Sequence, residues 1–289
     1  MTSVLGRMQN FDKTLTPSEA KVAEFIRRKP DDVVNNSIKD VASLAGVSVA
    51  SASRLAVTLG YRDWKQMRHN LVKDMADTPD TVFADVSRDD SGEAIIKKIF
   101  DCSILSLRDT FDQVDAGDIL KVVAAIKKTD RLVFFGTGRS GCFAMEESLR
   151  FAHLDISAEA YSDEYQMILQ ASRIRKEQVC FGFSNSGRSR AAVGALATAK
   201  RNKAITIGIA NYRETPLEKV SDIYFCTSFP RVGEISSSLT ARIALLCIMD
   251  AIYFLSAQQG GSSSGAILAD RLINKNLRLP ARGRNIKGF

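Results

Sequence analysis

The second half of the chain alternates short apolar runs with longer amphipathic segments, and this alternation constrains the fold more than any other feature. Each apolar run has the length of a buried strand, and each intervening segment is long enough for a helix. Parallel strands need such helical crossovers, so the pattern predicts a three-layer α/β domain with a five-stranded parallel sheet. The predicted strands are Arg131–Phe135, Ile156–Tyr161, Val179–Phe183, Ala204–Ile209 and Ile223–Thr227.

Two loops rich in glycine and serine follow the first and third predicted strands. The loops are Gly136-Thr137-Gly138-Arg139-Ser140-Gly141 and Ser184-Asn185-Ser186-Gly187-Arg188-Ser189. Both place hydroxyls and free backbone N–H groups at a helix N-terminus, where partial positive charge favours a phosphate. In a sheet ordered 2-1-3-4-5 these two strands are neighbours at the point where the strand order reverses. We therefore expect both loops to border one crevice and to bind one phosphorylated ligand.

The first loop also allows two other interpretations. Gly136, Gly138 and Gly141 match the Gly-x-Gly-x-x-Gly pattern of nicotinamide-binding folds, and Asp163 stands near the position of a ribose-binding acid. The pattern alone is a weak signal, and the serine-rich second loop has no role in it. Each loop taken separately could also be an ordinary turn. An NAD-binding enzyme and a pair of plain turns stay open as alternatives.

The first eighty residues have the helix signals of a DNA-binding motif. Thr16 and Glu19 form a capping box around Pro17, which predicts a helix that Pro30 ends. A short helix is predicted over Ile38–Ala45, with Gly46 in the turn after it, and Ser48 begins another helix that Gly60 ends. Two short helices joined by a tight glycine turn predict a helix-turn-helix, whose second helix enters the major groove.

The second of these helices has one apolar face and one polar face. Small residues on the polar face let the backbone approach the bases, and Arg54 is the one long donor there that can contact guanine or phosphate. The alternative is a helical bundle with a solvated arginine. The inward face is predicted to hold Ala52, Leu55, Ala56 and Leu59, and the DNA-contacting residues are predicted to be Ser48, Ala50, Ser51, Arg54 and Thr58.

Charge is distributed in a way that suits contact with a polyanion. Residues 1–80 contain 12 Lys and Arg against 10 Asp and Glu, and residues 266–289 contain 6 against 1. The middle of the chain is balanced, so the net charge of +7 comes from the two ends. The five cysteines include no Cys-x-x-Cys pair, which argues against a disulfide framework and a zinc site. We predict no metal and no cofactor.

Neither end of the sequence suggests export or a membrane anchor. Residues 1–10 lack the apolar core of a secretory signal, and the longest apolar stretch, Ile243–Leu255, contains Asp250 and is shorter than the ~18 residues of a membrane span. A cytoplasmic protein is therefore expected. The predicted organisation is a DNA-binding domain over 1–77, a polar linker over 78–92, the α/β domain over 93–258 and a flexible basic tail over 259–289.

Taken together, these motifs resemble a known family. Gly-Thr-Gly-Arg-Ser and Ser-Asn-Ser-Gly-Arg-Ser resemble the signature loops of sugar isomerase (SIS) domains, and the helix with Arg54 resembles the recognition region of RpiR-type regulators. The order of the two domains is also that family's. The resemblance implies a flavodoxin-like sheet, a homodimer or homotetramer, and an effector that is a phosphorylated sugar or sugar acid.

The resemblance also implies which residues bind the effector. By position these are Gly138, Arg139, Ser140, Ser184, Asn185, Ser186, Ser189 and Glu234. Ser189 stands where the family often has threonine, and Leu55 stands where many relatives have an aromatic residue after the arginine. The operator sequence cannot therefore be carried over.

An isomerase is the alternative function that the resemblance raises. Moving a proton between adjacent carbons needs a base with a pKa near neutral and a partner for ring opening. Glu234 could be the base. The histidine available as the partner for ring opening, His153, is instead expected to satisfy terminal carbonyls of a helix. We therefore predict a DNA-binding regulator and no catalytic activity.

Overall fold

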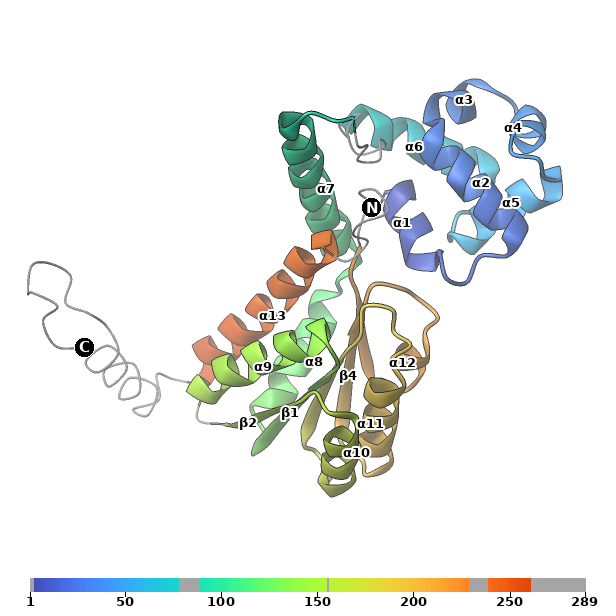
Figure 1. Cartoon of the computed structure of the whole chain (residues 1–289). Helices are drawn as coiled ribbons and strands as arrows, with labels where there is room; N and C mark the ends of the chain where they lie inside the picture. Colours follow the sequence, from blue (N-terminus) through green and yellow to red (C-terminus); the bar gives the residue numbers. More distant parts are fainter. Residues whose placement is uncertain (1–2, 78–88, 155, 229–238, 261–289) are drawn as a thin grey trace, which may run out of the picture.

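The computed structural model describes residues 3–77, 89–154, 156–228 and 239–260, as a helical N-terminal part and a layered α/β part (Figure 1). The N-terminal helices are α1 (Val4–Phe11), α2 (Pro17–Arg28), α3 (Pro30–Asn35), α4 (Ile38–Leu44), α5 (Val49–Thr58) and α6 (Trp64–Asp77). Two further helices, α7 (Gly92–Gln113) and α8 (Ala116–Ile126), lead into the sheet. The remaining elements are β1 (Arg131–Gly136), α9 (Arg139–Phe151), η2 (Ala152–Leu154), β2 (Ser157–Tyr161), α10 (Glu164–Arg173), β3 (Val179–Phe183), α11 (Arg190–Arg201), β4 (Ile205–Ala210), α12 (Pro216–Lys219), β5 (Ile223–Cys226) and α13 (Leu239–Gly260).

Side-chain caps explain where the N-terminal helices begin. The capping box at α2 is confirmed, because Thr16 accepts from the Glu19 backbone and the Glu19 carboxylate accepts from Thr16 in return. Pro30 does more than end α2. It opens α3, a helix that was not predicted, because proline at the first helical position loses no hydrogen bond. The short α1, capped by Ser3, was also not predicted.

The helical part has its own core, and α7 takes part in it. Met8 of α1, Ile26 of α2, Leu55 of α5 and Leu71 of α6 are fully buried there. Burying each such side chain stabilises the fold by about 1.5–3 kcal/mol. Cys102 and Leu105 of α7 belong to the same cluster. Because α7 also packs against α13, it connects the two parts of the chain.

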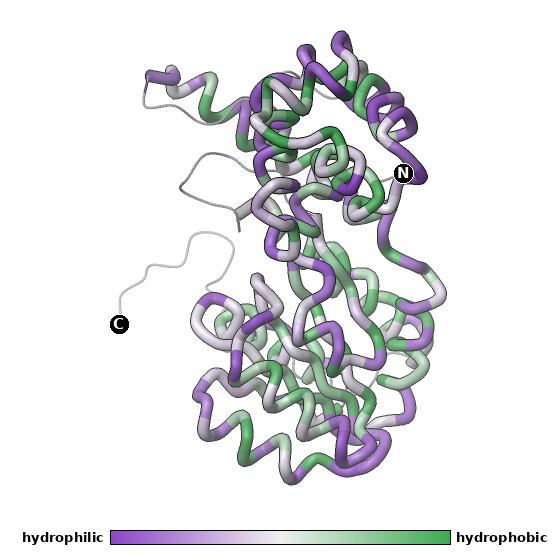
Figure 2. Tube along the Cα trace, turned by 90° about the vertical axis from the view of Figure 1, so that its right-hand side faces the viewer, coloured by the Kyte–Doolittle hydropathy of each residue, from purple (hydrophilic) through white to green (hydrophobic). Residues whose placement is uncertain are grey.

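The predicted five-stranded sheet is confirmed, with all strands parallel in the order β2-β1-β3-β4-β5. Successive residues of a strand point to opposite faces, so Phe134 and Phe135 enter different cores. Phe134 stacks on Phe181 with ring centroids 5.1 Å apart, under α8, α9 and α13. The other face lies under α10 and α11. The tube of the sheet is mostly green, and purple stretches lie on the elements around it (Figure 2).

Helix α13 extends beyond the apolar stretch Ile243–Leu255 at both ends. Its segment Ala241–Gln258 is long and apolar enough to cross a membrane, and 33% of that segment is buried. The helix packs against α7 and α8 over one face of the sheet, as a covering helix of an α/β domain does. It continues to Gly260, two residues into the predicted tail, and residues 261–289 lie outside the described part of the chain.

A buried carboxylate joins α9 to α13. Glu147 is fully buried, and Arg150 donates to its Oε1 at 3.0 Å and to Asp250 of α13 at 2.5 Å. Among the described residues, Oε2 of Glu147 has no hydrogen-bond partner. Burial raises the pKa of Glu147 to about 7, although Arg150 acts to lower it. The carboxylate therefore becomes harder to keep charged as the chain folds.

Replacing Glu147 with glutamine should flatten the dependence of stability on pH. The folded pKa lies above the unfolded value, so the stability that Glu147 contributes is complete in acid and is lost as the pH rises through about 7. We expect the wild-type chain to lose roughly 1–3 kcal/mol of unfolding free energy over this range, and Glu147→Gln to lose little. Urea denaturation at mildly acidic and mildly alkaline pH measures this. Glu93→Gln, a change at an exposed glutamate, is the control. If the unfolding free energy of Glu147→Gln depends on pH as strongly as that of the wild type, burial of Glu147 does not cost the folded chain stability.

Candidate functional site

The first glycine-rich loop needs its glycines because the chain turns back on itself. A Cβ at Gly136 would lie 2.4 Å from the Ser140 carbonyl oxygen, and one at Gly141 would lie 2.7 Å from the Ser162 side chain. Gly138 has a φ of +57° and caps α9 without a side-chain hydrogen bond. No side chain caps α9, which leaves its positive end open to an anion, although the N–H groups of Ser140 and Gly141 donate to the Thr137 and Gly138 carbonyls.

The second loop turns tightly between β3 and α11. Ser184 is buried and accepts from the Ser189 backbone N–H at 3.4 Å, and Ser189 caps α11 by accepting from Ala192. Ser186 accepts from the Arg188 N–H at 3.3 Å. Gly187 has a φ of +64°, in the left-handed region that favours glycine. The hydroxyls of this loop are thus gathered around the start of α11.

The two loops meet, as the strand order predicted. The hydroxyl of Thr137 in the first loop lies 3.3 Å from the hydroxyl of Ser189 in the second. This contact follows from the pairing of β1 with β3, which brings the carboxyl ends of both strands together. The N-termini of α9 and α11 therefore face one region at the carboxyl ends of β1 and β3.

A pocket of about 310 Å³ opens beside the two loops. It contains three residues predicted to bind a ligand, Arg139, Ser140 and Asn185. Gly138, Ser184, Ser186 and Ser189 build the loops next to it and do not line it, and Glu234 lies outside the described residues. The full lining is Arg139, Ser140, Cys142, Phe143, Glu146, Asn185, Asn211, Ala241, Arg242 and Leu245.

Sequence reasoning missed seven of the ten lining residues, among them Asn211 and Arg242. Asn211 follows β4, and its backbone N–H donates to the Asn185 carbonyl at 3.0 Å, so it extends the second loop. Arg242 comes from the first turn of α13, more than a hundred residues after Arg139. No local pattern marks either residue, although asparagine at the end of a parallel strand is a hint. The pocket thus holds two guanidinium groups against one carboxylate, Glu146.

The acid of the nicotinamide alternative has a local role. Asp163 accepts from the Gln166 backbone N–H at 2.9 Å and caps α10. It does not line the pocket beside the loops. An N-cap carboxylate of this kind is explained by helix formation alone.

In the N-terminal part, α4 and α5 form a helix-turn-helix. Gly46 has a φ of +65° in the turn, where the Val47 N–H donates to the Ala42 carbonyl at 2.9 Å. Ser48 then caps α5 by accepting from the Ser51 N–H. The chain bends by 102° between the two helices, within the range of DNA-binding helix-turn-helix motifs.

The exposed face of α5 differs from the predicted one at two positions. Ala50 and Arg54 are exposed as expected. Ser51 is 4% exposed, because its hydroxyl pairs with Ser48 and is covered by Arg54, which donates to it at 3.1 Å. Thr58 is turned inward, where it donates to Glu19 of α2 at 2.8 Å. Val57 is 59% exposed in their place, so the face is less polar than predicted.

Comparison with known proteins matches both parts of the chain. Residues 2–78 match the model of the helix-turn-helix domain of the rpiR family, and residues 125–253 match the SIS domain. An uncharacterized HTH-type transcriptional regulator of Caldanaerobacter subterraneus subsp. tengcongensis is 29% identical over 90% of this chain and 92% of its own length.

Two solved structures share the fold. The Vibrio vulnificus NanR protein complexed with ManNAc-6P has a TM-score of 0.58 and 18% identity, covering 96% of this chain and 99% of that one. A candidate sugar-phosphate isomerase of Listeria monocytogenes has a TM-score of 0.55 and 16% identity, covering 63% of this chain and 98% of that one. By its two domain matches, the chain joins a helix-turn-helix domain of the rpiR family to a SIS domain.

Proposed function

We propose that this chain is a cytoplasmic regulator of carbohydrate metabolism whose affinity for its operator is controlled by a phosphorylated sugar or sugar acid in the SIS domain. The observation that carries the proposal is the meeting of the two hydroxyl-rich loops at Thr137 and Ser189, beside a pocket with two guanidinium groups. Such a site offers backbone N–H groups and hydroxyls for a phosphate and polar space for a sugar.

The effector contacts follow from the position of each residue. The phosphate would lie on the loop hydroxyls and the N-termini of α9 and α11, contributed by Gly138, Ser140, Ser184, Ser186 and Ser189. The sugar would extend into the pocket, toward Asn185, Asn211 and the charges of Arg139 and Arg242. Glu234 stays a candidate contact from the sequence alone.

DNA binding is assigned to the exposed face of α5. Arg54 would contact a guanine or a phosphate, Ala50 and Ser48 would let the helix approach the groove, and Val57 offers an apolar contact for a thymine methyl group. Ser51 would act indirectly by holding Arg54. Two copies of the chain would bind half-sites about 34 Å apart, or multiples of this, which is why we keep the homodimer or homotetramer as part of the proposal.

The sensing half is tested by a thermal-shift screen. Hexose 6-phosphates, pentose 5-phosphates and 6-phosphogluconate would be compared with the same sugars lacking phosphate. At a concentration 100 times its Kd, a ligand adds about 2.7 kcal/mol, so we expect a rise in Tm of roughly 5–10 °C for at least one phosphorylated compound. Ser184→Ala should lose this rise and keep its operator affinity. Stabilisation by no phosphorylated compound would reject the proposal, and turnover of the stabilising sugar phosphate would favour an isomerase.

A further inference from the structure

Helix α1 belongs to the core of the DNA-binding domain, yet its two ends are bonded to α7 and, at the last turn, to the SIS domain. At its start, the backbone N–H and hydroxyl of Ser3 donate to the Asp109 carboxylate of α7 at 2.8 and 2.5 Å. Ser228, at the end of β5, donates to the same carboxylate at 3.4 Å, and its N–H donates to Thr110. Asp109 is 3% exposed, so these bonds are protected from water.

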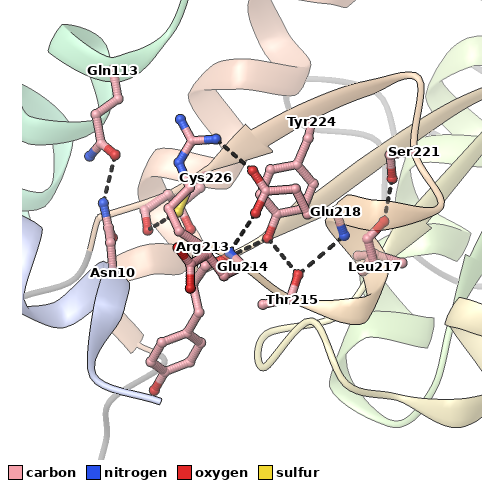
Figure 3. A network of polar contacts seen from close by, with 12 residues as sticks. Asn10, Gln113, Arg213, Glu214, Thr215, Leu217, Glu218, Ser221, Tyr224 and Cys226 are labelled. Atoms are coloured by element: carbon pink, nitrogen blue, oxygen red, sulfur yellow. Dashed lines mark hydrogen bonds and ion pairs between the residues drawn. The ribbon is translucent and has the colours of Figure 1, made fainter. Parts of the chain in front are cut away.

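At its other end, α1 is bonded to the loop after β4. The Arg213 backbone N–H donates to the Asn10 carbonyl at 2.9 Å, and the Asn10 amide donates to Gln113 of α7 at 2.6 Å (Figure 3). The ammonium of Lys13, just past the helix, lies 5.9 Å from the centre of the Tyr212 ring. Residues 212 and 213 of the SIS domain thus hold the last turn of α1.

The same loop forms part of the effector pocket. Asn211, directly before Tyr212, lines the pocket and is bonded to the second signature loop through Asn185. The loop is held in place, because Tyr224 donates to the Tyr212 carbonyl. The Arg213 guanidinium also binds Glu218 (Figure 3). A shift of Asn211 would therefore move residues 212 and 213 with it.

The opposite side of α1 reaches the recognition helix. Arg7 donates to the Leu59 carbonyl at 3.0 Å, and Leu59 is the C-terminal cap of α5. The Arg7 guanidinium also lies 4.7 Å from the centre of the Tyr61 ring. The contact is imperfect, since Nε of Arg7 and Oδ1 of Asn10 are buried without a hydrogen-bond partner among the described residues. Buried polar atoms without a partner are rare in native structures, and a second arrangement that pairs them would account for these two.

We propose that α1 transmits effector occupancy from Asn211–Arg213 through Asn10 and Arg7 to the end of the recognition helix. This inference rests on the proposed function, and it locates the regulation in this contact rather than in the linker over 78–92. Effector contact with Asn211 would favour one position of the loop, and α1 would shift α5 relative to the SIS domain. In this inference the effector and the operator each bias the position of α1, which is what coupling between two sites requires.

The substitution Gly6→Ala tests this path with a single methyl group. A Cβ at Gly6 would lie 2.2 Å from Oδ2 of Asp109 and 2.8 Å from Oγ of Ser228, so α1 cannot keep its position against the SIS domain. Alanine favours helix more than glycine does, and α1 itself is not weakened. Gly92→Ala is the matched control, because a Cβ there meets nothing within 4 Å.

The readout is the ratio of operator affinities with and without effector. The probes are a duplex selected from a random library by the wild-type chain, and glucose 6-phosphate or 6-phosphogluconate, whichever stabilises that chain more. We expect roughly a tenfold ratio for the wild type and Gly92→Ala, and a ratio near one for Gly6→Ala with effector affinity retained. The double variant Asn10→Ala/Lys13→Ala adds no atoms and removes the Asn10–Gln113 bond and the Lys13–Tyr212 contact, while it keeps the backbone bond from Arg213 to Asn10. It should lower the ratio in part, and it decides the matter if Gly6→Ala does not fold.

Two results would overturn the inference in different ways. A wild-type ratio that Gly6→Ala and the double variant both retain would reject α1 as the path and leave the proposed function standing. A ratio of one in the wild type, with effector bound, would reject the proposed control of operator affinity together with the path.

Discussion

Arg54→Ala should weaken binding to the selected operator duplex by roughly 10- to 100-fold, which corresponds to the ~1–3 kcal/mol of a bidentate arginine–guanine contact. Arg54 is the exposed long donor of α5, and its guanidinium is already oriented by the bond to Ser51. A contact that is oriented before binding loses less side-chain entropy when DNA arrives. Fluorescence anisotropy with a labelled duplex measures the loss directly.

The control for Arg54→Ala is Arg28→Ala. Arg28 is an exposed arginine of the same domain, on α2, where it pairs with Glu24. Both changes remove one positive charge, so a general electrostatic effect would weaken both variants alike and reduce the salt dependence of both. Equal operator affinities for Arg54→Ala and the wild type would remove Arg54 from the DNA contact.

Gly187→Ala should raise the Kd for the stabilising sugar phosphate by roughly tenfold or more, the equivalent of ~1.4 kcal/mol. Gly187 has a positive φ, and a Cβ there would lie 2.5 Å from the Thr215 side chain. Its carbonyl also accepts from the Leu217 N–H, so the loop cannot relax freely. We expect the loop to be displaced, and with it the hydroxyls of Ser186 and Ser189. Isothermal titration calorimetry measures the Kd.

Gly46→Ala separates backbone strain from loop geometry. Gly46 also has a positive φ, but it lies in the helix-turn-helix and a Cβ there meets nothing within 4 Å. Both substitutions carry the strain of a side chain in the left-handed region, roughly 1–3 kcal/mol. Only Gly187→Ala should bind the effector more weakly than the wild type does. Wild-type effector affinity in Gly187→Ala would mean that the second loop does not form the binding site.

The sheet was predictable because its signals are local. Most strands are apolar runs, and in the order 2-1-3-4-5 the first and third strands are neighbours, so the meeting of their loops at Thr137 and Ser189 followed from that order. The capping box of α2 was predictable for the same reason. Helices α1 and α3 were missed, since they have eight and six residues and depend on tertiary contacts for their stability.

The remaining features of the site depend on contacts between distant segments. Arg242 enters the pocket only because α13 packs over the sheet beside α9, which no local pattern specifies. Ser51 was assigned to the outer face from helical spacing, but its bonds to Ser48 and Arg54 bury it. The bonds of α1 to Asp109 and Arg213 join segments about 100 and 200 residues apart, far beyond the reach of periodicity.

Control of DNA binding by one ligand site can be tested in a single titration. Operator affinity of the full chain is measured by anisotropy without effector and with the stabilising sugar phosphate at saturation, which the thermal shift verifies in the same samples. We expect the operator Kd to change by roughly tenfold, about 1.4 kcal/mol of coupling. An operator Kd that stays the same while the sugar phosphate is bound would contradict this expectation.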